Sequence, residues 1–418
     1  MPEMKDSGIE WIGEIPNSWN VIKGKYVLKY LQKPIREDDG VITCFRDGEV
    51  TLRSNRREDG FTMSDKEIGY QGIDVGDLVV HGMDGFAGSI GISDSRGKAS
   101  PVLVVLDSDN NKRFLMYYLR STAYRDVFLA LATGIRVRSC DLRWNKLAEL
   151  PYLVPPIEVQ NKIADFLDSK CAEIDALVAD IQSEIETLEE YKKSFITEAV
   201  TKGLNPDVRM KDSGIEYVGD IPSSWEIHPV YYYFGERKAK NYALKEQNLL
   251  SLSYGKIIRK DINTNGGLLP ASFNTYNIVE AGDIIIRPTD LQNDKRSLRT
   301  GLVTEHGIIT SAYIDLMPIG DINSEYFHYL LHAFDVMKVF YNMGNGVRQG
   351  LNYSEFSKLI IFAPSRKEQD DIVVYLKDKC SAIEETIALK KEQIETLEEC
   401  KKSVIYEYVT GKKEVPLS

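Results

Sequence analysis

Apolar side chains recur at alternating intervals of three and four residues along two long, highly charged segments. This spacing places one apolar stripe along an α-helix and is typical of helices that pair lengthwise. We therefore predict helices over 156–203 and 365–412, each of about 40 residues and about 60 Å, and expect each to pair with the other. Lys390 stands in the stripe where the first helix has Ile181, and either fixes the register or extends to solvent. The stripe consists of Leu167, Cys171, Ile174, Val178, Ile181, Ile185 and Leu188, and of Leu376, Cys380, Ile383, Ile387, Lys390, Ile394 and Leu397.

Prolines and glycines mark both ends of these helices. Pro155 and Pro156 precede the first helix, and Pro364 precedes the second. Proline suits a helix start because the first backbone N–H groups lack an intrahelical acceptor anyway. Gly203 and Gly411 follow the last apolar positions, as expected for glycine at a helix C-terminus.

The remaining segments alternate short β-rich runs with single helical stretches. Residues 77–80, 102–106 and 283–286 are predicted as strands. Residues 113–131 and 324–341 have apolar and aromatic residues at helical spacing and are predicted as core helices. These segments therefore form mixed domains of the α/β type.

The chain is a tandem repeat with a period of roughly 206 to 212 residues, long enough for a whole domain plus a helix. Residues 4–10 return unchanged as 210–216, and residues 185–190 return as 394–399. The prediction is an α+β protein with an internal pseudo-twofold repeat. Its parts are a first domain with a short leader over 1–155, a helix over 156–203, a second domain over 204–364, a helix over 365–412 and a tail over 413–418.

The two copies agree at their ends and disagree in their middles. Residues 44–100 and 250–310 share little beyond a Gly-Asp strand. One scaffold therefore carries two different inserts, as recognition of two different targets requires.

The net charge of the whole chain, −11 at pH 7, is unfavourable for a nucleic-acid partner. Residues 157–200 and 365–410 carry −7 and −3, however, so the rest is nearly neutral and has local basic clusters. Binding follows the local field rather than the total charge. The five cysteines form no Cys-x-x-Cys pair, and the sequence has no membrane-spanning apolar run or signal-peptide pattern. We expect a cytoplasmic protein without disulfides or a zinc ribbon.

Catalytic motifs are poorly represented. Residues 91–99 resemble a phosphate-binding loop but have the wrong glycine spacing and no following Ser or Thr. No dinucleotide-binding turn follows a strand, and no Asn/Asp-Pro-Pro-aromatic tetrapeptide indicates a base methyltransferase. His328 and His332 lie four residues apart, but two histidines without a third ligand are weak evidence for metal. We predict neither a catalytic nor a metal site.

Candidate nucleic-acid contacts are better represented. Arg-rich stretches and two Gly-x-Arg turns, at 134–136 and 346–348, provide side chains that can hold phosphates or read base edges. Taken singly, each cation is better explained as solvated surface than as a base contact; the two readings are balanced only for the Gly-x-Arg turns, which recur in both copies. The candidates are Arg53, Asn55, Arg56, Arg57, Arg136, Arg138 and Arg143 in the first copy, and Lys256, Arg259, Lys260, Arg287, Lys295, Arg296, Arg299, Arg348 and Gln349 in the second.

Together these features resemble the specificity subunit of type I restriction-modification systems, over essentially the whole chain. The resemblance rests on the leader Lys-Asp-Ser-Gly-Ile-Glu-Trp-Ile-Gly-Glu-Ile-Pro, on the Gly-x-Arg turn that leads to a proline and a glutamine at the helix start (Gln160, Gln369), and on the domain–helix–domain–helix order. The second copy departs slightly, with Ala-Pro-Ser at 363–365 where the first has Val-Pro-Pro.

The resemblance implies a fold and a set of partners. Each variable domain would be a target-recognition domain for one half of a split DNA sequence, and the helices would pack as an antiparallel coiled coil that spaces the two halves. Two methyltransferase subunits, and restriction or translocase subunits, would assemble with the chain on double-stranded DNA. AdoMet and ATP/Mg would belong to those partners, and this chain would hold no cofactor.

Two other readings stay open on the sequence. The chain could be a stand-alone DNA-modifying enzyme whose site lies unrecognised in the divergent middles, or a coiled-coil scaffold without a DNA role. Activity of the isolated chain would indicate the former. Salt-dependent DNA binding by the assembled complex would exclude the latter.

Overall fold

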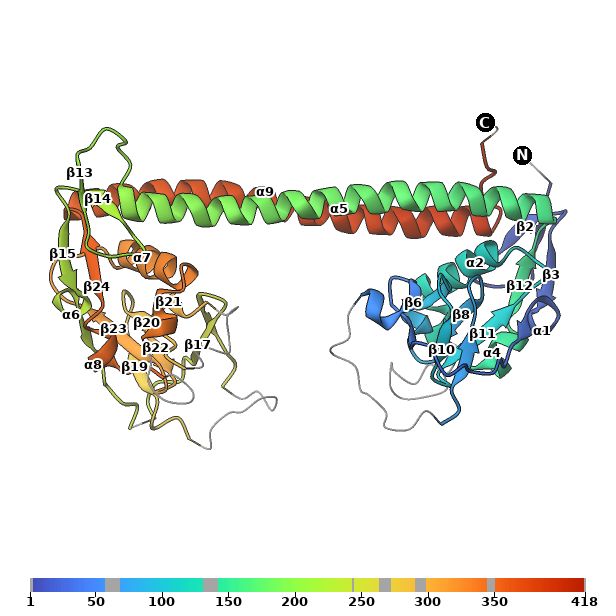
Figure 1. The fold of residues 1–418 in the computed structure, drawn as a ribbon, viewed down its shortest axis with the longest axis horizontal. Helices are drawn as coiled ribbons and strands as arrows, with labels where there is room; N and C mark the ends of the chain where they lie inside the picture. The colour runs from blue at the N-terminus through green and yellow to red at the C-terminus, as the bar shows by residue number, and fades with distance from the viewer. Residues whose placement is uncertain are drawn as a thin grey trace. The chain divides into compact units, whose positions relative to one another are not determined.

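A computed structural model describes residues 3–56, 68–130, 142–242, 244–262, 272–289, 298–343 and 350–416. The chain divides into two compact units. Unit 1 comprises residues 1–181 and 391–418, and unit 2 comprises residues 182–390. Each unit therefore contains one repeat domain together with part of each long helix (Figure 1).

Each repeat is a run of short elements that ends in one long helix. In the first repeat they are β1 (Met4–Asp6), β2 (Glu14–Pro16), β3 (Asn20–Lys23), α1 (Gly24–Val27), β4 (Lys29–Tyr30), β5 (Ile42–Cys44), β6 (Val50–Leu52), the 3-10 turn η1 (Arg53–Asn55), β7 (Gln71–Ile73), β8 (Leu78–His81), η2 (Gly85–Ala87), β9 (Ile90–Ile92), β10 (Gly97–Ala99), β11 (Leu103–Asp107), α2 (Lys112–Tyr124), α3 (Val127–Ala130), α4 (Trp144–Glu149), β12 (Pro151–Val154) and α5 (Ile157–Lys202).

The second repeat has the corresponding order. Its elements are β13 (Met210–Asp212), β14 (Asp220–Pro222), β15 (Glu226–Pro229), α6 (Val230–Tyr233), β16 (Phe234–Glu236), β17 (Leu250–Ser253), β18 (Lys256–Arg259), β19 (Asn277–Val279), β20 (Ile284–Ile286), β21 (Thr300–Leu302), β22 (Gly307–Ile309), β23 (Ile314–Pro318), α7 (Ser324–Val336), η4 (Val339–Asn342), α8 (Tyr353–Phe356), β24 (Ile360–Ala363) and α9 (Arg366–Val409).

Each repeat is centred on a four-stranded sheet, ordered β4-β11-β8-β9 in unit 1 and β16-β23-β20-β21 in unit 2. The ladders between these strands are antiparallel. The mixed α and β character is confirmed; parallel pairing occurs in isolated bridges such as Val41–Lys98 and Val50–Ser93.

Both faces of the central strand β8 are covered. Leu78 and Val80 face one cluster that includes Phe114 of α2, whereas Val79 belongs to a second cluster with Ile42. Alternate strand residues point to opposite faces, so burial on both sides requires an unbroken apolar run. This is why the sequence shows a continuous apolar run at this strand instead of alternation.

The predicted core helices are each interrupted. Helix α2 ends at Tyr124 and α7 ends at Val336, earlier than the predictions of 131 and 341. Asp126 and Lys338 follow with φ of 58° and 63°, in the left-handed region. A left-handed residue cannot continue a right-handed helix, so a separate short turn begins after each of them.

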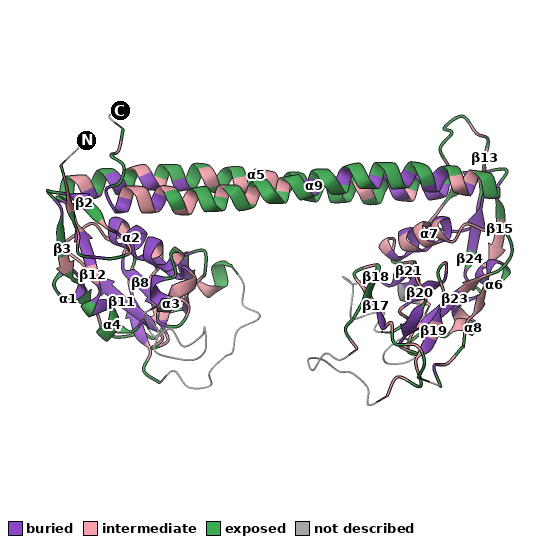
Figure 2. Cartoon of the chain, turned by 180° about the vertical axis from the view of Figure 1, so that it is seen from behind, coloured by how far each residue is buried: buried purple, intermediate pink, exposed green. Residues whose placement is uncertain are grey.

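The long helices begin and end close to their predicted limits. Helix α5 has 46 residues and α9 has 44. Gly203 and Gly411 follow them with φ of 74° and 71°. Every residue of the predicted stripe is buried or half-buried, while most other helix positions are exposed (Figure 2).

Ion pairs fix the direction in which the helices pair. In unit 2, Lys192 pairs with Glu384 and Glu184 pairs with Lys390. Residue numbers rise along α5 as they fall along α9, so these helix segments are antiparallel. Lys390 is 23% exposed and forms its ion pair with Glu184 across the two helices.

Candidate nucleic-acid interface

A glutamine at the start of each long helix joins that helix to its domain. Gln160 Oε1 accepts a hydrogen bond from the backbone N–H of Asn111 at 2.9 Å, and its Nε2 donates to Pro155 O at 2.8 Å. Gln369 accepts from the N–H of Asn323 at 2.9 Å in the same way. Both asparagines cap the N-termini of α2 and α7 through their side chains. The start of each long helix is thus tied to the start of the domain's main helix.

Each leader packs against the end of a long helix. A Cβ on Gly411 would lie 2.5 Å from Pro16 Cδ and 3.2 Å from Trp19 Cη2. A Cβ on Gly203 would lie 3.3 Å from Trp225 Cζ2. The first leader therefore packs against the end of α9, and the second packs against the end of α5. These matched contacts belong to the scaffold and leave the divergent middles for recognition.

Arg56 lies after η1 in the divergent middle of unit 1. Its Nη1 lies 2.6 Å from Asp47 Oδ2 and 3.1 Å from Glu49 Oε2. Its guanidinium also stands 4.2 Å from the centroid of the Phe45 ring. The side chain is thus held by two carboxylates and an aromatic face, and binding a phosphate would require it to exchange those partners.

The neighbouring candidates Arg53 and Asn55 are held by hydroxyl groups of adjacent strands. Arg53 Nε donates to Thr43 Oγ1 at 3.3 Å, and Asn55 Nδ2 donates to Thr51 Oγ1 at 2.8 Å. Asn55 is exposed, as is Arg143 just before α4. The structure brings Arg53, Asn55 and Arg56 together on one segment.

A cavity of about 560 Å³ borders this segment. Its lining includes the cations Arg46, Arg53 and Arg56 and the acids Asp47 and Asp84. Donors and acceptors are both present, as readout of base edges requires. This cavity is the best-formed candidate recognition surface among the described residues of unit 1.

The corresponding surface of unit 2 is a β-hairpin. Tyr254 and Gly255 connect β17 to β18 with φ of 47° and 80°. Two successive positive φ values are the signature of a type I′ hairpin turn. Tyr254 is 83% exposed at this tip. The exposed cations on and after β18 are Lys256, Arg259 and Lys260.

Arg259 is paired rather than free. Its Nε lies 2.8 Å from Glu305 Oε1, and the side chains are 74% and 31% exposed. The carboxylate raises the pKa of Arg259, and the guanidinium lowers the pKa of Glu305. Glu305 therefore competes with any phosphate for this arginine.

Arg299 requires a correction. It was predicted to contact DNA, but its side chain is 0% exposed. Its Nη1 donates to Thr289 O, and its backbone N–H donates to the Asp335 carboxylate. Arg299 therefore joins β21 to α7 inside the domain and has no surface for DNA. Arg287 is half-buried, and its N–H donates to Arg299 O at 2.8 Å.

The other predicted contacts lie outside the described residues. They are Arg57, Arg136, Arg138, Lys295, Arg296, Arg348 and Gln349, together with both Gly-x-Arg turns. Their role stays a prediction.

Sequence reasoning missed an ion network that organises the middle of unit 1. Lys33 lies 2.7 Å from Asp77 and 2.8 Å from Asp74, and Arg96 lies 2.7 Å from both Asp74 and Asp39. The Lys33 ammonium and the Arg96 guanidinium lower the pKa of Asp74 to about 2. No local motif identifies these five residues, because 63 positions separate the first from the last along the chain.

Metal ligation finds no support in the described part of the chain. No group of three or more His, Cys, Asp or Glu side chains there could hold an ion. His328 and His332 lie with ring centroids 6.2 Å apart, and burial lowers the pKa of each to about 4. The pair therefore stays neutral within the core of unit 2.

None of the described helices is long and apolar enough to span a membrane.

These features define a class of protein in which a duplicated scaffold presents two dissimilar surfaces. The putative type I restriction enzyme MjaX specificity subunit of Methanocaldococcus jannaschii is 24% identical, over 96% of this chain and 95% of that protein. The MjaVIII specificity subunit of the same organism is 23% identical, over 95% and 93%. No protein-family model matches the chain.

The fold agrees with these sequence similarities. A chain in a solved structure concerned with complex assembly and conformational transition of the type I R-M system covers 96% of this chain, with a TM-score of 0.68 and 13% identity. That match covers 99% of the solved chain. The resemblance to type I restriction-modification specificity subunits is confirmed.

Proposed function

We propose that this chain is the non-catalytic DNA-specificity subunit of a type I restriction-modification complex. Residues 1–155 and 204–364 act as two target-recognition domains that read the halves of a split, asymmetric sequence. The helices over 156–203 and 365–412 form an antiparallel coiled coil that sets the spacing between the half-sites, and residues 413–418 are a tail.

The observation that carries this proposal is the contrast between matched scaffold and unmatched middles. The Gln160–Asn111 contact recurs as Gln369–Asn323 with the same distance. The hairpins placed on that scaffold, β5–β6 and β17–β18, correspond but carry different side chains, with Arg53 and Arg56 after the first and Lys256, Arg259 and Lys260 on and after the second. A protein that brings two different DNA sequences to identical partner subunits needs one scaffold that is the same in both repeats and two recognition surfaces that differ.

The partners follow from the function. Two methyltransferase subunits dock on the duplicated scaffold, one for each repeat, and restriction or translocase subunits join them on double-stranded DNA. AdoMet and ATP/Mg are bound by those partners, and this chain binds no cofactor. The complex works in the cytoplasm, where its DNA target lies.

Methylation mapping tests the proposal. Cells expressing this chain with its methyltransferase are expected to methylate one bipartite motif, whereas the chain alone with AdoMet or Mg²⁺ modifies and cuts nothing. Arg136→Ala is expected to weaken recognition of one half-site, and Arg348→Ala that of the other. Absence of a bipartite motif would overturn the proposal, and equal loss at both halves would overturn independent reading by the two domains.

A further inference from the structure

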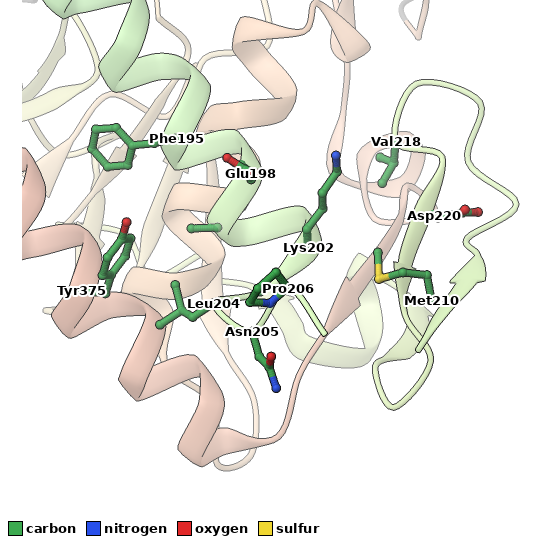
Figure 3. Close-up of a pocket in the computed structure, with 12 residues that line it drawn as sticks. Phe195, Glu198, Lys202, Leu204, Asn205, Pro206, Met210, Val218, Asp220 and Tyr375 are labelled. Atoms are coloured by element: carbon green, nitrogen blue, oxygen red, sulfur yellow. The ribbon is translucent and has the colours of Figure 1, made fainter. Parts of the chain in front are cut away.

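Unit 2 has an open cavity of about 760 Å³ at the end of α5 (Figure 3). Its apolar wall includes Phe195, Ala199, Leu204 and Tyr375, contributed by both long helices and by the chain after Gly203. Leu204 is 41% exposed and Tyr375 is 38% exposed. Apolar surface in a concave site of this size is typical of a place where another molecule docks.

The same place in unit 1 is filled by the chain itself. The helices match with a fixed offset of 209 residues, since 185–190 return as 394–399. Tyr375 therefore corresponds to Phe166, and Ala199 corresponds to Tyr408. In unit 1 the Phe166 and Tyr408 rings pack with centroids 4.4 Å apart. In unit 2 one of the two rings is replaced by a methyl group, so Tyr375 has no aromatic partner at that position.

Neighbouring replacements widen the difference between the units. Val374 is 60% exposed where unit 1 has Asp165, which lies 2.6 Å from Arg113. Beyond the helices the terminal glycines Gly203 and Gly411 set the match, with an offset of 208 residues, so Leu204 takes the place of Lys412, which donates to Glu14 O. Unit 2 thus exposes apolar groups at two positions where unit 1 has charged groups with partners.

The charges at the cavity favour a protein over DNA. Glu198 and Asp220 line it together with a single cation, Lys202. A phosphate backbone would meet two carboxylates here, whereas sequence-independent DNA binding requires a cationic surface. Apolar pockets with a polar rim are where aromatic anchor side chains of protein partners bind.

We propose that this cavity receives a ring-bearing side chain of a methyltransferase subunit, in the position that Tyr408 fills in unit 1. The inference rests on the proposed function, which gives each repeat one such partner. It adds that the two repeats hold identical partners through different contacts. The cavity belongs to the matched scaffold rather than to a divergent middle, which assigns it to the partner common to both repeats.

Ala199→Tyr tests the proposal by supplying the missing ring from within the chain. Native mass spectrometry and calorimetric titration with the purified methyltransferase subunit are expected to show two subunits on the wild type. On Ala199→Tyr, affinity at one of the two sites is expected to fall at least tenfold. Ala199→Ser, which keeps the cavity, is the matched control and is expected to bind like the wild type.

A second variant distinguishes weaker methyltransferase binding from misfolding of the chain. Leu204→Lys lies outside the helix, copies Lys412 of unit 1 and is expected to weaken the same site, with hydrogen exchange of α5 and α9 unchanged. Two undiminished sites on both variants would overturn this inference and leave the proposed function intact. A wild-type chain that binds no methyltransferase would overturn both. Self-association of the chain that Ala199→Tyr abolishes would assign the cavity to a second copy and overturn the inference.

Discussion

Gln160 and Asn111 lie 49 positions apart, yet the glutamine carboxamide accepts the asparagine backbone N–H at 2.9 Å, with Gln160 only 1% exposed. A buried carboxamide has both its oxygen and its N–H groups hydrogen-bonded only when the acceptor and the donor partners are both correctly positioned. The contact therefore specifies the angle at which the helix leaves the domain, which is the property a spacer must hold constant.

Gln160→Ala is expected to destabilise unit 1 by about 1–3 kcal/mol, because it leaves the half-buried Asn111 N–H without its acceptor. Hydrogen exchange of α2 and of the start of α5 measures the effect. Gln182→Ala, at an exposed position of the same helix, is the control and is expected to change stability by less than about 0.5 kcal/mol. Similar losses from both variants would show that helix propensity rather than the buried contact is responsible.

The glycines that end the long helices are expected to differ in their tolerance of alanine. Each takes a left-handed φ, which costs an L-residue about 1–2 kcal/mol. Gly411→Ala would also place its Cβ 2.5 Å from Pro16 Cδ, whereas the nearest atom to a Cβ on Gly203 is Glu368 Oε1 at 3.2 Å. Gly411→Ala should therefore cost more than Gly203→Ala.

Gly320→Ala separates the cost of the left-handed backbone from the cost of a close Cβ contact. Gly320 has φ of 77° with nothing within 4 Å of its Cβ position, so Gly320→Ala reports the backbone cost alone. Chemical denaturation of the three variants is expected to rank them Gly411, Gly203, Gly320 in decreasing loss. A loss for Gly411→Ala no greater than that for Gly320→Ala would show that the leader moves aside and does not close tightly on α9.

The sequence predicted features whose causes are local. The apolar stripe and the terminal glycines gave the limits of α5 and α9, and a single apolar run gave β8. The break after α2 was not predictable, because Asp126 is left-handed without being glycine. Arg299 was misread because surface and buried arginines look alike in a sequence. Its burial depends on Thr289 and on Asp335, 36 positions away.

Removing a carboxylate from the β17–β18 surface is expected to tighten DNA binding. Glu305 holds Arg259, so Glu305→Gln releases a cation that is 74% exposed. In the assembled complex, affinity should rise a few-fold, and the slope of log K against log salt should steepen by roughly one, as for one added phosphate contact. Glu216→Gln, an exposed leader residue, removes the same charge elsewhere and serves as the control. Equal gains in affinity from both variants would show that the change in net charge, and not the release of Arg259, tightens DNA binding.

Asp315 makes the stability of unit 2 depend on pH. The residue is 1% exposed on β23, and burial, followed by repulsion from Asp283, raises its pKa to about 8 against the attraction of Arg237. Arg237 is engaged with Asp283, at 2.7 Å between Nε and Oδ2, and Glu236 adds further negative charge nearby. The first repeat has Val105 at the matching ladder position of β11, so the carboxyl is not required by the scaffold.

The number of protons bound in the folded and unfolded states determines whether stability rises or falls with pH. Between about pH 4 and pH 8 the folded carboxyl keeps its proton while the unfolded one loses it, so stability falls as pH rises through this window and is level above it. Asp315→Asn removes the dependence and should stabilise unit 2 by a few kcal/mol at pH 8, at about 1.4 kcal/mol per pKa unit, but little at pH 4. Hydrogen exchange of β23 at pH 5 and pH 8, against the exposed control Asp207→Asn, measures it. An equal gain at both pH values would mean that the introduced amide improves packing and that the carboxyl does not titrate in this range.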